Sequence, residues 1–224
     1  MIVAIDGPAG SGKGAIGRRL AERFSLAYLD TGALYRAVAR DARAAGVPVE
    51  GDARHDAALS RIASDIDLAT LDDPVLRTQE IGVAASMVAR LQAVRAALLP
   101  LQRDFAHAPP DGCPGAVLDG RDIGTVVCPD ADVKIFLTAS PEARMKRRAT
   151  QLRQAGAAVD EAAILKEILE RDARDAQRAA APMKEARDAA LLDTTLLDID
   201  AAFEAARGLV EAAIARKRGG AGKP

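Results

Sequence analysis

The chemistry that the sequence offers first is phosphate binding, close to its N-terminus. Residues 7–15 read GPAGSGKGA, which has the spacing of a phosphate-binding P-loop, with Gly14 where Ser or Thr is usual. Glycines let the backbone wrap around a polyphosphate at the start of a helix, where N–H groups and the helix dipole favour anions. Lys13 supplies a charge for the outer phosphates. Because apolar, strand-like residues precede the loop and a helix pattern follows it, we expect nucleoside triphosphate binding rather than a flexible glycine turn.

A second candidate site follows the apolar residues 116–118. Asp119 ends that segment as the aspartate of a Walker B strand does, where the carboxylate orients magnesium or its waters. Arg121 and Asp122 come next, at the edge where open α/β sheets bind their ligands. A turn that holds a salt-bridged pair is the alternative, but beside a P-loop we favour a functional role for both residues.

Arginines recur on the helices predicted further along the chain. Arg144, Arg147 and Arg148 share one helical face, and like charges so close repel unless they face an anion or solvent. Phosphoryl transfer needs such cations, because charge develops on the oxygens of the transferred group. A solvated basic face explains this segment equally well.

A further arginine-rich stripe holds Arg171, Asp175 and Arg178. Arg171 and Asp175 have the i,i+4 spacing of an ion pair, which on a surface contributes only about 0.2–0.5 kcal/mol. Arg77 follows Asp-Asp-Pro at 72–74 and, by itself, cannot be told from a surface residue near a helix start. Neither segment alone separates a binding residue from an ordinary one.

Residues 29–36 leave a predicted strand and enter a helix. Thr31 is expected to cap this helix, and Arg36 lies one turn further, where it can reach a phosphate on the same face. Taken alone, an ordinary capped helix with a surface arginine is the better explanation of this segment.

The elements that must position these residues alternate between strand and helix. Five apolar segments predict a parallel sheet, and four of them are followed at once by an aspartate: Asp6, Asp30, Asp119 and Asp193. The predicted strands are residues 2–5, 27–29, 116–118, 133–137 and 190–192, and the predicted helices are residues 16–24, 34–45, 56–66, 77–105, 141–154, 161–180 and 201–217. This order predicts a doubly wound α/β fold. The connections 36–110 and 141–182 are too long for simple crossovers, so we expect them to project over the carboxyl edge of the sheet and close on ligands.

Composition excludes several classes of protein. The 31 basic and 32 acidic residues give a formal charge of −1, so the chain has no overall basic field for nucleic acid. Its two cysteines, Cys113 and Cys128, fit neither a metal site nor a disulfide framework, which suggests a reducing compartment. No apolar segment approaches transmembrane length, and the first predicted strand leaves no room for a signal peptide. We therefore expect a cytoplasmic protein without nucleic-acid or membrane partners, and a monomer.

Together these segments resemble the cytidylate kinases of the nucleoside monophosphate kinase family. The matching strings follow the family's order over nearly the whole chain: IDGP at 5–8, GKG at 12–14, LDTGALYR at 29–36, RTQE at 77–80, DGRDIGTVV at 119–127, KIFL at 134–137, ERDARD at 170–175 and RAAAP at 178–182. This combination is far more specific than the P-loop alone.

The resemblance implies a P-loop NTPase fold of the α/β class, with a five-stranded parallel sheet flanked by helices, a nucleoside-monophosphate-binding insertion and a helical lid. It divides residues 1–217 into a core at 1–35, 111–140 and 183–217, an insertion at about 36–110 and a lid at about 141–182, before a disordered tail at 218–224. It also implies transfer of the γ-phosphoryl group of ATP to CMP or dCMP, with Mg²⁺.

The same resemblance assigns roles to residues. The loop that would cradle ATP consists of Gly7, Pro8, Ala9, Gly10, Ser11, Gly12, Lys13, Gly14 and Ala15. The implied catalytic residues are Lys13, Arg121, Arg144 and Arg148, and the implied substrate-binding residues are Asp30, Thr31, Arg36, Arg77, Arg121, Asp122, Arg171, Asp175 and Arg178. Arg36 and Arg121 would hold the acceptor's phosphate. Arg77, Asp122 and Arg178 would lie around the cytosine, whereas Arg171 and Asp175 would approach the ribose.

The chain departs from the family's pattern in two places. Ala15 replaces the Thr that often follows Gly-Lys-Gly, so the loop has no side-chain oxygen at the usual metal position. We therefore expect phosphates and water to hold the magnesium without direct side-chain ligands, with Asp119 or Asp30 orienting the waters. Residues 65–77 are also shorter than in many members, which carry there a strand-rich excursion with a hydroxyl that touches the base. We expect discrimination among CMP, dCMP and UMP to depend on this difference.

Other functions fit the sequence less well. Another small P-loop kinase, acting on a different nucleotide or on a metabolite such as shikimate, would share the loop but not the strings at 119–127 and 171–182 together. A GTPase is excluded because the chain contains no asparagine for the guanine-reading Asn-Lys-x-Asp motif. A nucleic-acid-binding ATPase would need a basic stripe or an aromatic platform, and the chain has only two tyrosines and four phenylalanines.

Overall fold

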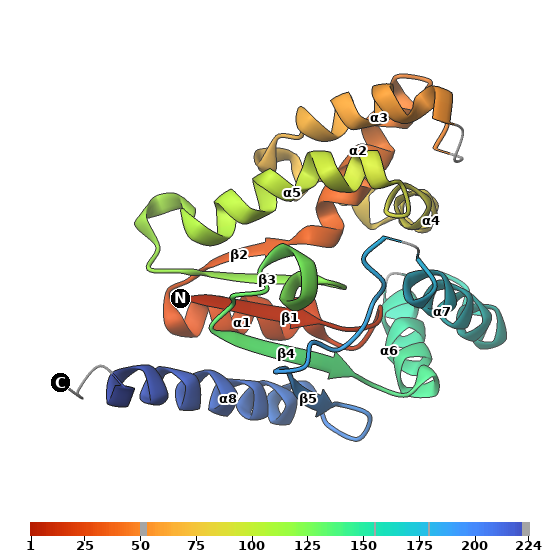
Figure 1. Ribbon diagram of the computed structural model, residues 1–224. Coiled ribbons are helices and arrows are strands. Elements are labelled where there is room, and N and C mark those ends of the chain that lie inside the picture. Colours follow the sequence, from red (N-terminus) through yellow and green to blue (C-terminus); the bar gives the residue numbers. More distant parts are fainter. Residues whose placement is uncertain (50–52, 155, 179, 221–224) are drawn as a thin grey trace.

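The computed structural model describes residues 1–49, 53–154, 156–178 and 180–220, and five parallel strands form its centre (Figure 1). The strands are β1 (Ile2–Asp6), β2 (Ala27–Asp30), β3 (Ala116–Gly120), β4 (Val133–Thr138) and β5 (Ala190–Asp193). They lie in the order β2-β3-β1-β4-β5, and all neighbouring pairs are parallel. The five predicted strands are confirmed, and each extends one or two residues further at its carboxyl end.

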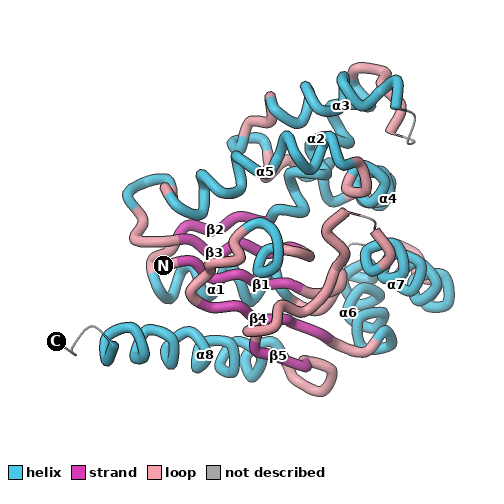
Figure 2. Tube along the Cα trace, in the orientation of Figure 1, coloured by secondary structure: helices cyan, strands magenta, loops and turns pink. Residues whose placement is uncertain are grey.

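Helices cover both faces of this sheet (Figure 2). The central strand β1 has apolar side chains on both of its sides, and each side needs helices to bury it. Val3 and Ile5 belong to an apolar core with α1 and α8, whereas Ile2 and Ala4 belong to another with α2 to α5. The helices are α1 (Lys13–Phe24), α2 (Thr31–Ala44), α3 (Ala53–Ser64), α4 (Gln79–Val88), α5 (Gln92–His107), α6 (Pro141–Gln154), α7 (Glu161–Ala176) and α8 (Ile199–Gly220). The predicted α/β fold with helices on both faces is therefore confirmed.

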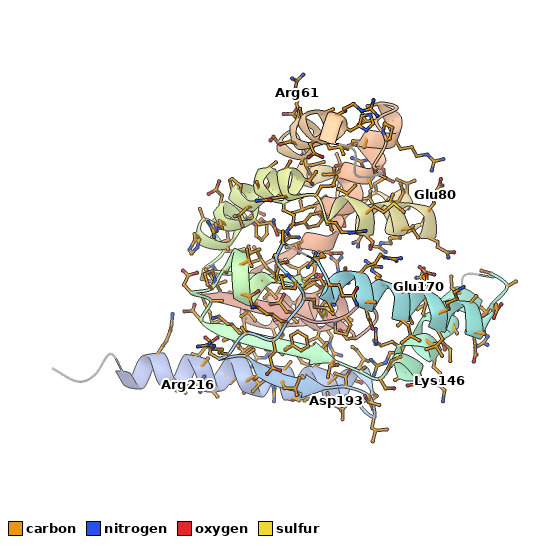
Figure 3. All side chains as sticks on the ribbon, turned by 45° about the vertical axis from the view of Figure 1, so that its right-hand side comes forward. Arg61, Glu80, Lys146, Glu170, Asp193 and Arg216 are labelled. Atoms are coloured by element: carbon orange, nitrogen blue, oxygen red, sulfur yellow. The ribbon has the colours of Figure 1, made fainter. Side chains whose placement is uncertain are left out.

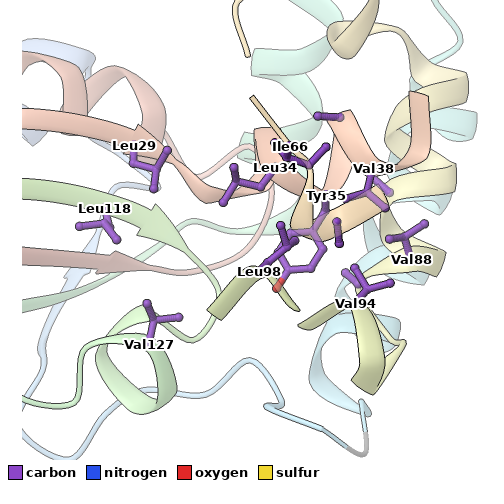
Figure 4. Packing of buried hydrophobic residues seen from close by; sticks show 14 of the residues in the cluster. Leu29, Leu34, Tyr35, Val38, Ile66, Val88, Val94, Leu98, Leu118 and Val127 are labelled. Atoms are coloured by element: carbon purple, nitrogen blue, oxygen red, sulfur yellow. The ribbon is translucent and has the colours of Figure 1, made fainter. Parts of the chain in front are cut away.

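The core with α2 to α5 joins the sheet to the helices that follow β2. Leu29 and Leu118 extend this core from the sheet, and Leu98 of α5 lies beside the Tyr35 ring of α2 (Figure 4). Four helices between β2 and β3 thus share one apolar core with the sheet, so that the base of this large insertion is fixed while its far end projects beyond the sheet (Figure 1).

The single helix predicted over residues 77–105 is wrong. Arg77 ends a short 3₁₀ helix, Pro74–Arg77, and α4 begins only at Gln79, where the Thr78 hydroxyl accepts a hydrogen bond from the Ile81 N–H. The chain then turns at residues 89–91, so α4 and α5 point in different directions and both reach the core. Among the described residues no single helix could span a membrane, and only Gln79–Val88 and Gln92–Gly112, bent by 99°, pass that test together.

Helices α1, α2 and α3 each begin three residues before the predicted start, and α7 and α8 differ most from their predictions at their C-terminal ends. Helix α7 ends at Ala176 rather than at residue 180, because Arg178 turns back to donate to the Ala181 carbonyl at 2.8 Å and the Met183 N–H bonds to the Asp175 carbonyl. Helix α8 continues to Gly220, so residues 218–220 of the predicted disordered tail are helical. Lys217 in this last part forms an ion pair with Asp132, which helps to hold it to the sheet. Residues 221–224 of the predicted tail lie outside the described residues.

Candidate active site

The predicted P-loop joins β1 to α1 and has the backbone that its glycines require. Gly7, Gly10 and Gly12 have positive φ angles of 142°, 77° and 102°. A Cβ on Gly7 would lie 1.9 Å from the main-chain oxygen of Leu137, so no other residue fits there. The buried Lys13 ammonium donates to the Pro8 carbonyl at 2.8 Å, which keeps it inside the loop.

Three cations from different elements lie close together at this loop, namely Lys13, Arg121 and Arg171, and Arg36 lies near Arg171. Burial lowers the pKa of Lys13, and repulsion from Arg121 and Arg171 lowers it further. Burial and the same repulsion from Arg121 lower the pKa of Arg171 to about 10. Positive charges held this close together away from water are stabilised by an anion bound between them.

Partners on the protein satisfy these cations only in part. Arg121 donates through Nε to Asp175 at 2.8 Å, and Arg36 donates through Nη2 to Asp30 at 2.5 Å. Within the described part of the chain, the buried Nε atoms of Arg36, Arg171 and Arg178 have no hydrogen-bond partner. Buried donors without partners are rare in proteins, so these arginines indicate a site for a ligand.

Asp175 pairs with Arg121 rather than with Arg171, whose i,i+4 spacing suggested a pair within the helix. Burial would raise the pKa of Asp175, but Arg121 and Arg171 outweigh it and hold that pKa below its ordinary value. The carboxylate therefore stays ionised between β3 and α7, where it fixes the Arg121 guanidinium.

A second group of buried charges lies around Asp122. Arg95 of α5 donates to one carboxylate oxygen, and Arg178 lies 3.9 Å from the other. The Arg95 guanidinium also lies 5.7 Å from the centre of the Tyr35 ring. Burial raises the pKa of Asp122, although Arg95 and Arg178 oppose this. Asp122 and Arg178 thus come together as expected, whereas Arg95 went unrecognised.

Nothing in the sequence marks Arg95, because it lies in an apolar helical pattern without a motif of its own. Ser86 of α4 was missed for the same reason, and its hydroxyl lies 3.3 Å from Nε of Arg174 on α7. Only the packing of α5 against the segment after β3, and of α4 against α7, brings these residues to the site. Their positions beside the buried Val94 and Leu98, or on α4, become informative only once the fold is known.

Arg77 does not join the Asp122 cluster. Its exposed side chain lines a pocket of about 180 Å³ together with Asp30, Arg36, Arg18 and Tyr28. The structure therefore places Arg77 on the side of Arg36, and its predicted contact with the base stays a prediction without a neighbour to support it.

The cap of α2 differs from its prediction by one residue. Asp30, not Thr31, is the N-cap, since its carboxylate accepts the Ala33 N–H at 3.1 Å. Thr31 is the first helical residue, and its buried hydroxyl donates to the Asp119 carbonyl at 2.7 Å. Thr31 thus ties α2 to β3, while Asp30 both caps the helix and holds Arg36.

The three arginines of α6 do not act alike. Arg144 is buried and donates to Asp172 of α7 and to the P-loop carbonyl of Ala9, the latter at 3.2 Å. Arg147 donates to the carbonyl and hydroxyl oxygens of Thr194, whereas Arg148 is exposed and has no polar partner in the described part of the chain. Arg144 therefore braces the P-loop, and the catalytic roles expected of Arg144 and Arg148 stay predictions.

Asp6, at the end of β1, supports the site from beneath. Its two carboxylate oxygens accept the N–H groups of Ile123 and Gly124, both at 2.7 Å. Burial raises the pKa of Asp6 to about 6 against the effect of these two bonds. The bonds fix the turn that follows Asp122. The sequence singled out Asp6 only as one of four aspartates at strand ends.

Asp119 and Asp30 are the acidic groups that face the P-loop. Burial raises the pKa of Asp119, and repulsion from Asp30 raises it further, although Lys13 opposes both. Among the described residues no three His, Cys, Asp or Glu side chains gather into a metal site. Two carboxylates beside a phosphate loop fit a magnesium ion carried by the nucleotide, whose water shell they can orient.

The family model of cytidylate kinase matches residues 3–211. The chain belongs to the cytidylate kinase family. A protein named cytidylate kinase from Bradyrhizobium sp. (strain ORS 278) is 52% identical over 212 residues, which cover 95% of this chain and 96% of the relative. Another so named, from Rhodospirillum rubrum, is 56% identical over 207 residues, covering 92% and 95%.

A solved structure agrees with the fold alone. An uncharacterised protein from Eubacterium ventriosum is 16% identical to this chain, with a TM-score of 0.52. The match covers 94% of this chain and 98% of that protein. Because the identity is so low, this likeness shows a shared fold and nothing about the substrate.

Proposed function

We propose that this protein transfers the γ-phosphoryl group of ATP to CMP or dCMP, giving ADP and CDP or dCDP. The observation that carries the proposal is the gathering of Lys13, Arg121 and Arg171 beside a P-loop, where the buried Nε of Arg171 has no hydrogen-bond partner among the described residues. Cations gathered in this way beside a phosphate-binding loop are suited to neutralising the phosphates of bound nucleotides. Membership of the family, with relatives named cytidylate kinase over nearly the whole chain, supports cytidine as the nucleoside of the acceptor.

The acceptor in this reaction is already a phosphate anion, so no strong general base is required. An oxygen of the acceptor's phosphate attacks the γ-phosphorus, and the bond from that phosphorus to the bridging oxygen of ADP breaks. Lys13 neutralises charge on the donor side, and Arg36 and Arg121 hold the acceptor's phosphate. Asp175 aids Arg121 by fixing its Nε, and Gly120 O accepts from its Nη1 at 3.1 Å.

The Asp122 cluster is the place for the base. Its carboxylate can accept from the exocyclic amino group of cytosine, and Arg95 and Arg178 can donate to the ring acceptors of the same edge. Uracil presents a carbonyl oxygen where cytosine has its amino group, and a carboxylate would repel it. We therefore propose that this cluster favours CMP over UMP, with Asp175 accepting from a sugar hydroxyl.

The remaining components follow from the same site. Mg²⁺ bound to the phosphates of ATP would be oriented through water by Asp119 and Asp30, and it supplies charge neutralisation for the transferring group. We propose a monomer that works in the cytoplasm, without nucleic-acid or membrane partners. Both cysteines are free thiols, which supports a reducing compartment.

A coupled assay of ADP release tests the proposed function. The protein is given ATP and Mg²⁺ with CMP, dCMP, UMP, AMP, GMP or shikimate as acceptor. We expect turnover with CMP and dCMP, weaker turnover with UMP and none with the rest. Absence of turnover with CMP, or equal turnover with AMP or GMP, would refute the assignment.

A further inference from the structure

The P-loop of this chain lacks the hydroxyl that usually follows its lysine, because residue 14 is glycine and residue 15 is alanine. A Cβ on Gly14 would lie 3.5 Å from the Tyr28 hydroxyl oxygen and 3.6 Å from Oδ2 of Asp119. A serine or threonine at position 14 would thus extend its own hydroxyl toward these two oxygens. The Tyr28 hydroxyl, which comes from β2, already lies beside Gly14 and Asp119.

Several features hold Tyr28 in this position. Its hydroxyl donates to Oδ2 of Asp119 at 2.9 Å. Its ring crosses α1 at Gly17, where a Cβ would lie only 2.8 Å from Cε2 of the ring, so the absence of a side chain makes room. The Arg18 guanidinium lies 4.6 Å from the centre of the ring. Gly17 therefore admits the ring of Tyr28 from the neighbouring strand, and the hydroxyl of that ring lies beside Gly14.

The protonation of Tyr28 suits a lasting bond to Asp119. Burial raises the pKa of Tyr28, and the negative charges of Asp119 and Asp30 raise it further. The phenol therefore keeps its proton and donates it to the carboxylate. The phenol oxygen retains lone pairs, which can accept a hydrogen bond from water.

We propose that Tyr28 is a positioning residue for the magnesium of the nucleotide, and that its hydroxyl takes the place of the one absent from residue 14. It fixes the Asp119 carboxylate and presents an oxygen beside the P-loop, so that both groups orient water on the metal. This inference rests on the proposed function, in which ATP with Mg²⁺ is the phosphoryl donor.

The first test removes the hydroxyl and keeps the ring. For wild type and Tyr28→Phe, calorimetry gives the affinity for ADP without metal and the Mg²⁺ concentration that half-saturates the metal-dependent binding. We expect that concentration to rise about tenfold in Tyr28→Phe, which is the loss of one hydrogen bond to a charged group. The metal-free affinity for ADP is expected to stay unchanged. Wild-type metal dependence in Tyr28→Phe would overturn the proposal.

The second test places a hydroxyl on residue 14 of the P-loop in the variant that lacks the Tyr28 hydroxyl. Gly14→Ser in the Tyr28→Phe background is expected to recover most of the metal affinity, whereas Gly14→Ala, which adds only the Cβ, is expected to recover none. Equal recovery by the alanine variant would show that packing, not the hydroxyl, is responsible. In the presence of Tyr28, Gly14→Ser is expected to bring no gain, and a tenfold gain there would also contradict the proposal.

These outcomes are separable from the proposed function. If the wild type fails to phosphorylate CMP, the proposed function is refuted whatever the variants do. If the wild type is active and Tyr28→Phe keeps its metal affinity, only the role of Tyr28 is refuted. The thermal unfolding midpoint of each variant shows whether it is folded, and Gly14→Ser alone tests the proposal even where Tyr28→Phe is unstable.

Discussion

Asp6 shows how single residues hold this site from below its surface. The carboxylate has no cation within ion-pair distance among the described residues, yet its two oxygens accept two main-chain N–H groups from the turn after Asp122. Burial nevertheless raises its pKa to about 6 from the ordinary value of 3.8. The residue therefore positions Asp122 at the expense of an unfavourable buried charge at neutral pH.

A pH dependence of stability follows for Asp6. Because its pKa is raised on folding, the folded protein binds a proton between pH 3.8 and about 6 that the unfolded chain releases. Its contribution to the free energy of unfolding is thus full below pH 3.8 and falls by about 3 kcal/mol as the pH rises through 6. Asp6→Asn lacks this titration, so urea unfolding of both proteins from pH 4 to 7.5 should give a difference that changes with pH. Parallel curves would contradict the argument.

Arg178 gives a second prediction for a single residue. Arg178→Ala removes one of two arginines beside Asp122 and leaves the P-loop untouched. We expect the KM for CMP to rise about tenfold or more, with the KM for ATP nearly unchanged, in steady-state kinetics. Arg187→Ala, at an exposed arginine without a polar partner in the described residues, serves as the control. Equal losses for both nucleotides would place Arg178 away from the base.

Among the elements, the P-loop is the one whose shape depends most on residue type. It leaves β1 next to β4, the neighbouring strand. Gly7 approaches the Leu137 carbonyl of β4 so closely that a Cβ would lie 1.9 Å from its oxygen. The first turn of α1 is open by comparison, because a Cβ on Gly14 would lie no closer than 3.5 Å to its nearest neighbour. The two glycines therefore have opposite tolerance although they belong to one motif.

This contrast predicts opposite effects of the same substitution. Gly7→Ala forces the backbone of β4 and the loop apart at a φ of 142° and should lower the free energy of unfolding by at least about 2 kcal/mol. Gly14→Ala lies in a helix without a clash, so its effect should remain within about 1 kcal/mol and favour the helix. Urea unfolding measures both. A similar loss in the two variants would refute this account of the loop.

How much of the fold the sequence predicted varies from element to element. The strands were predictable because each is a short apolar segment, and four of these segments are followed at once by an aspartate. Residues 77–105 were predicted as one helix because their apolar pattern is nearly continuous, yet the chain turns at 89–91 so that both α4 and α5 reach the core. Asp30 and Thr31 are both good capping residues, and sequence alone could not choose between them.

The residues of the candidate site also differ in how far the sequence could predict them. The P-loop, its lysine and the Asp119–Asp122 segment are local in sequence, and their spacing was enough to predict a common site. Arg95 and Asp122 are 27 residues apart, and only the packing of α5 brings them together. Arg144 was expected at the phosphates from the face it shares with Arg147 and Arg148, and its bonds to Asp172 of α7 and to the Ala9 carbonyl could not be read from that spacing. Contacts between distant elements were thus beyond the motifs.

The whole molecule adds a relation that no single element has. Helix α4, in the insertion after β2, meets α7, in the connection before β5, and both stand over the carboxyl edge of the sheet (Figure 3). Gln79 donates to Glu167 at 3.0 Å, and Arg174 lies 3.3 Å from the Ser86 hydroxyl. Arg174 lies between Arg171 and Arg178, so the contact joins the segment that faces the phosphates to the insertion. The insertion after β2 and the connection before β5, called here the two lobes, are therefore in contact with each other.

Glu167→Ala tests that relation. It removes the hydrogen bond from Gln79 and leaves the cores of both lobes intact, so the thermal unfolding midpoint should not change. One exposed hydrogen bond is worth about 0.5–1 kcal/mol, which lowers the fraction of closed molecules about two- to fivefold. We expect the KM for ATP and that for CMP to rise together in steady-state kinetics, because the contact joins elements on both sides of the proposed site. The control is Glu170→Ala on the same helix, at an exposed residue without a polar partner among the described residues, and it should change neither KM. An equal effect of the two variants, or a rise in only one KM, would argue that α4 and α7 do not couple the two halves of the site.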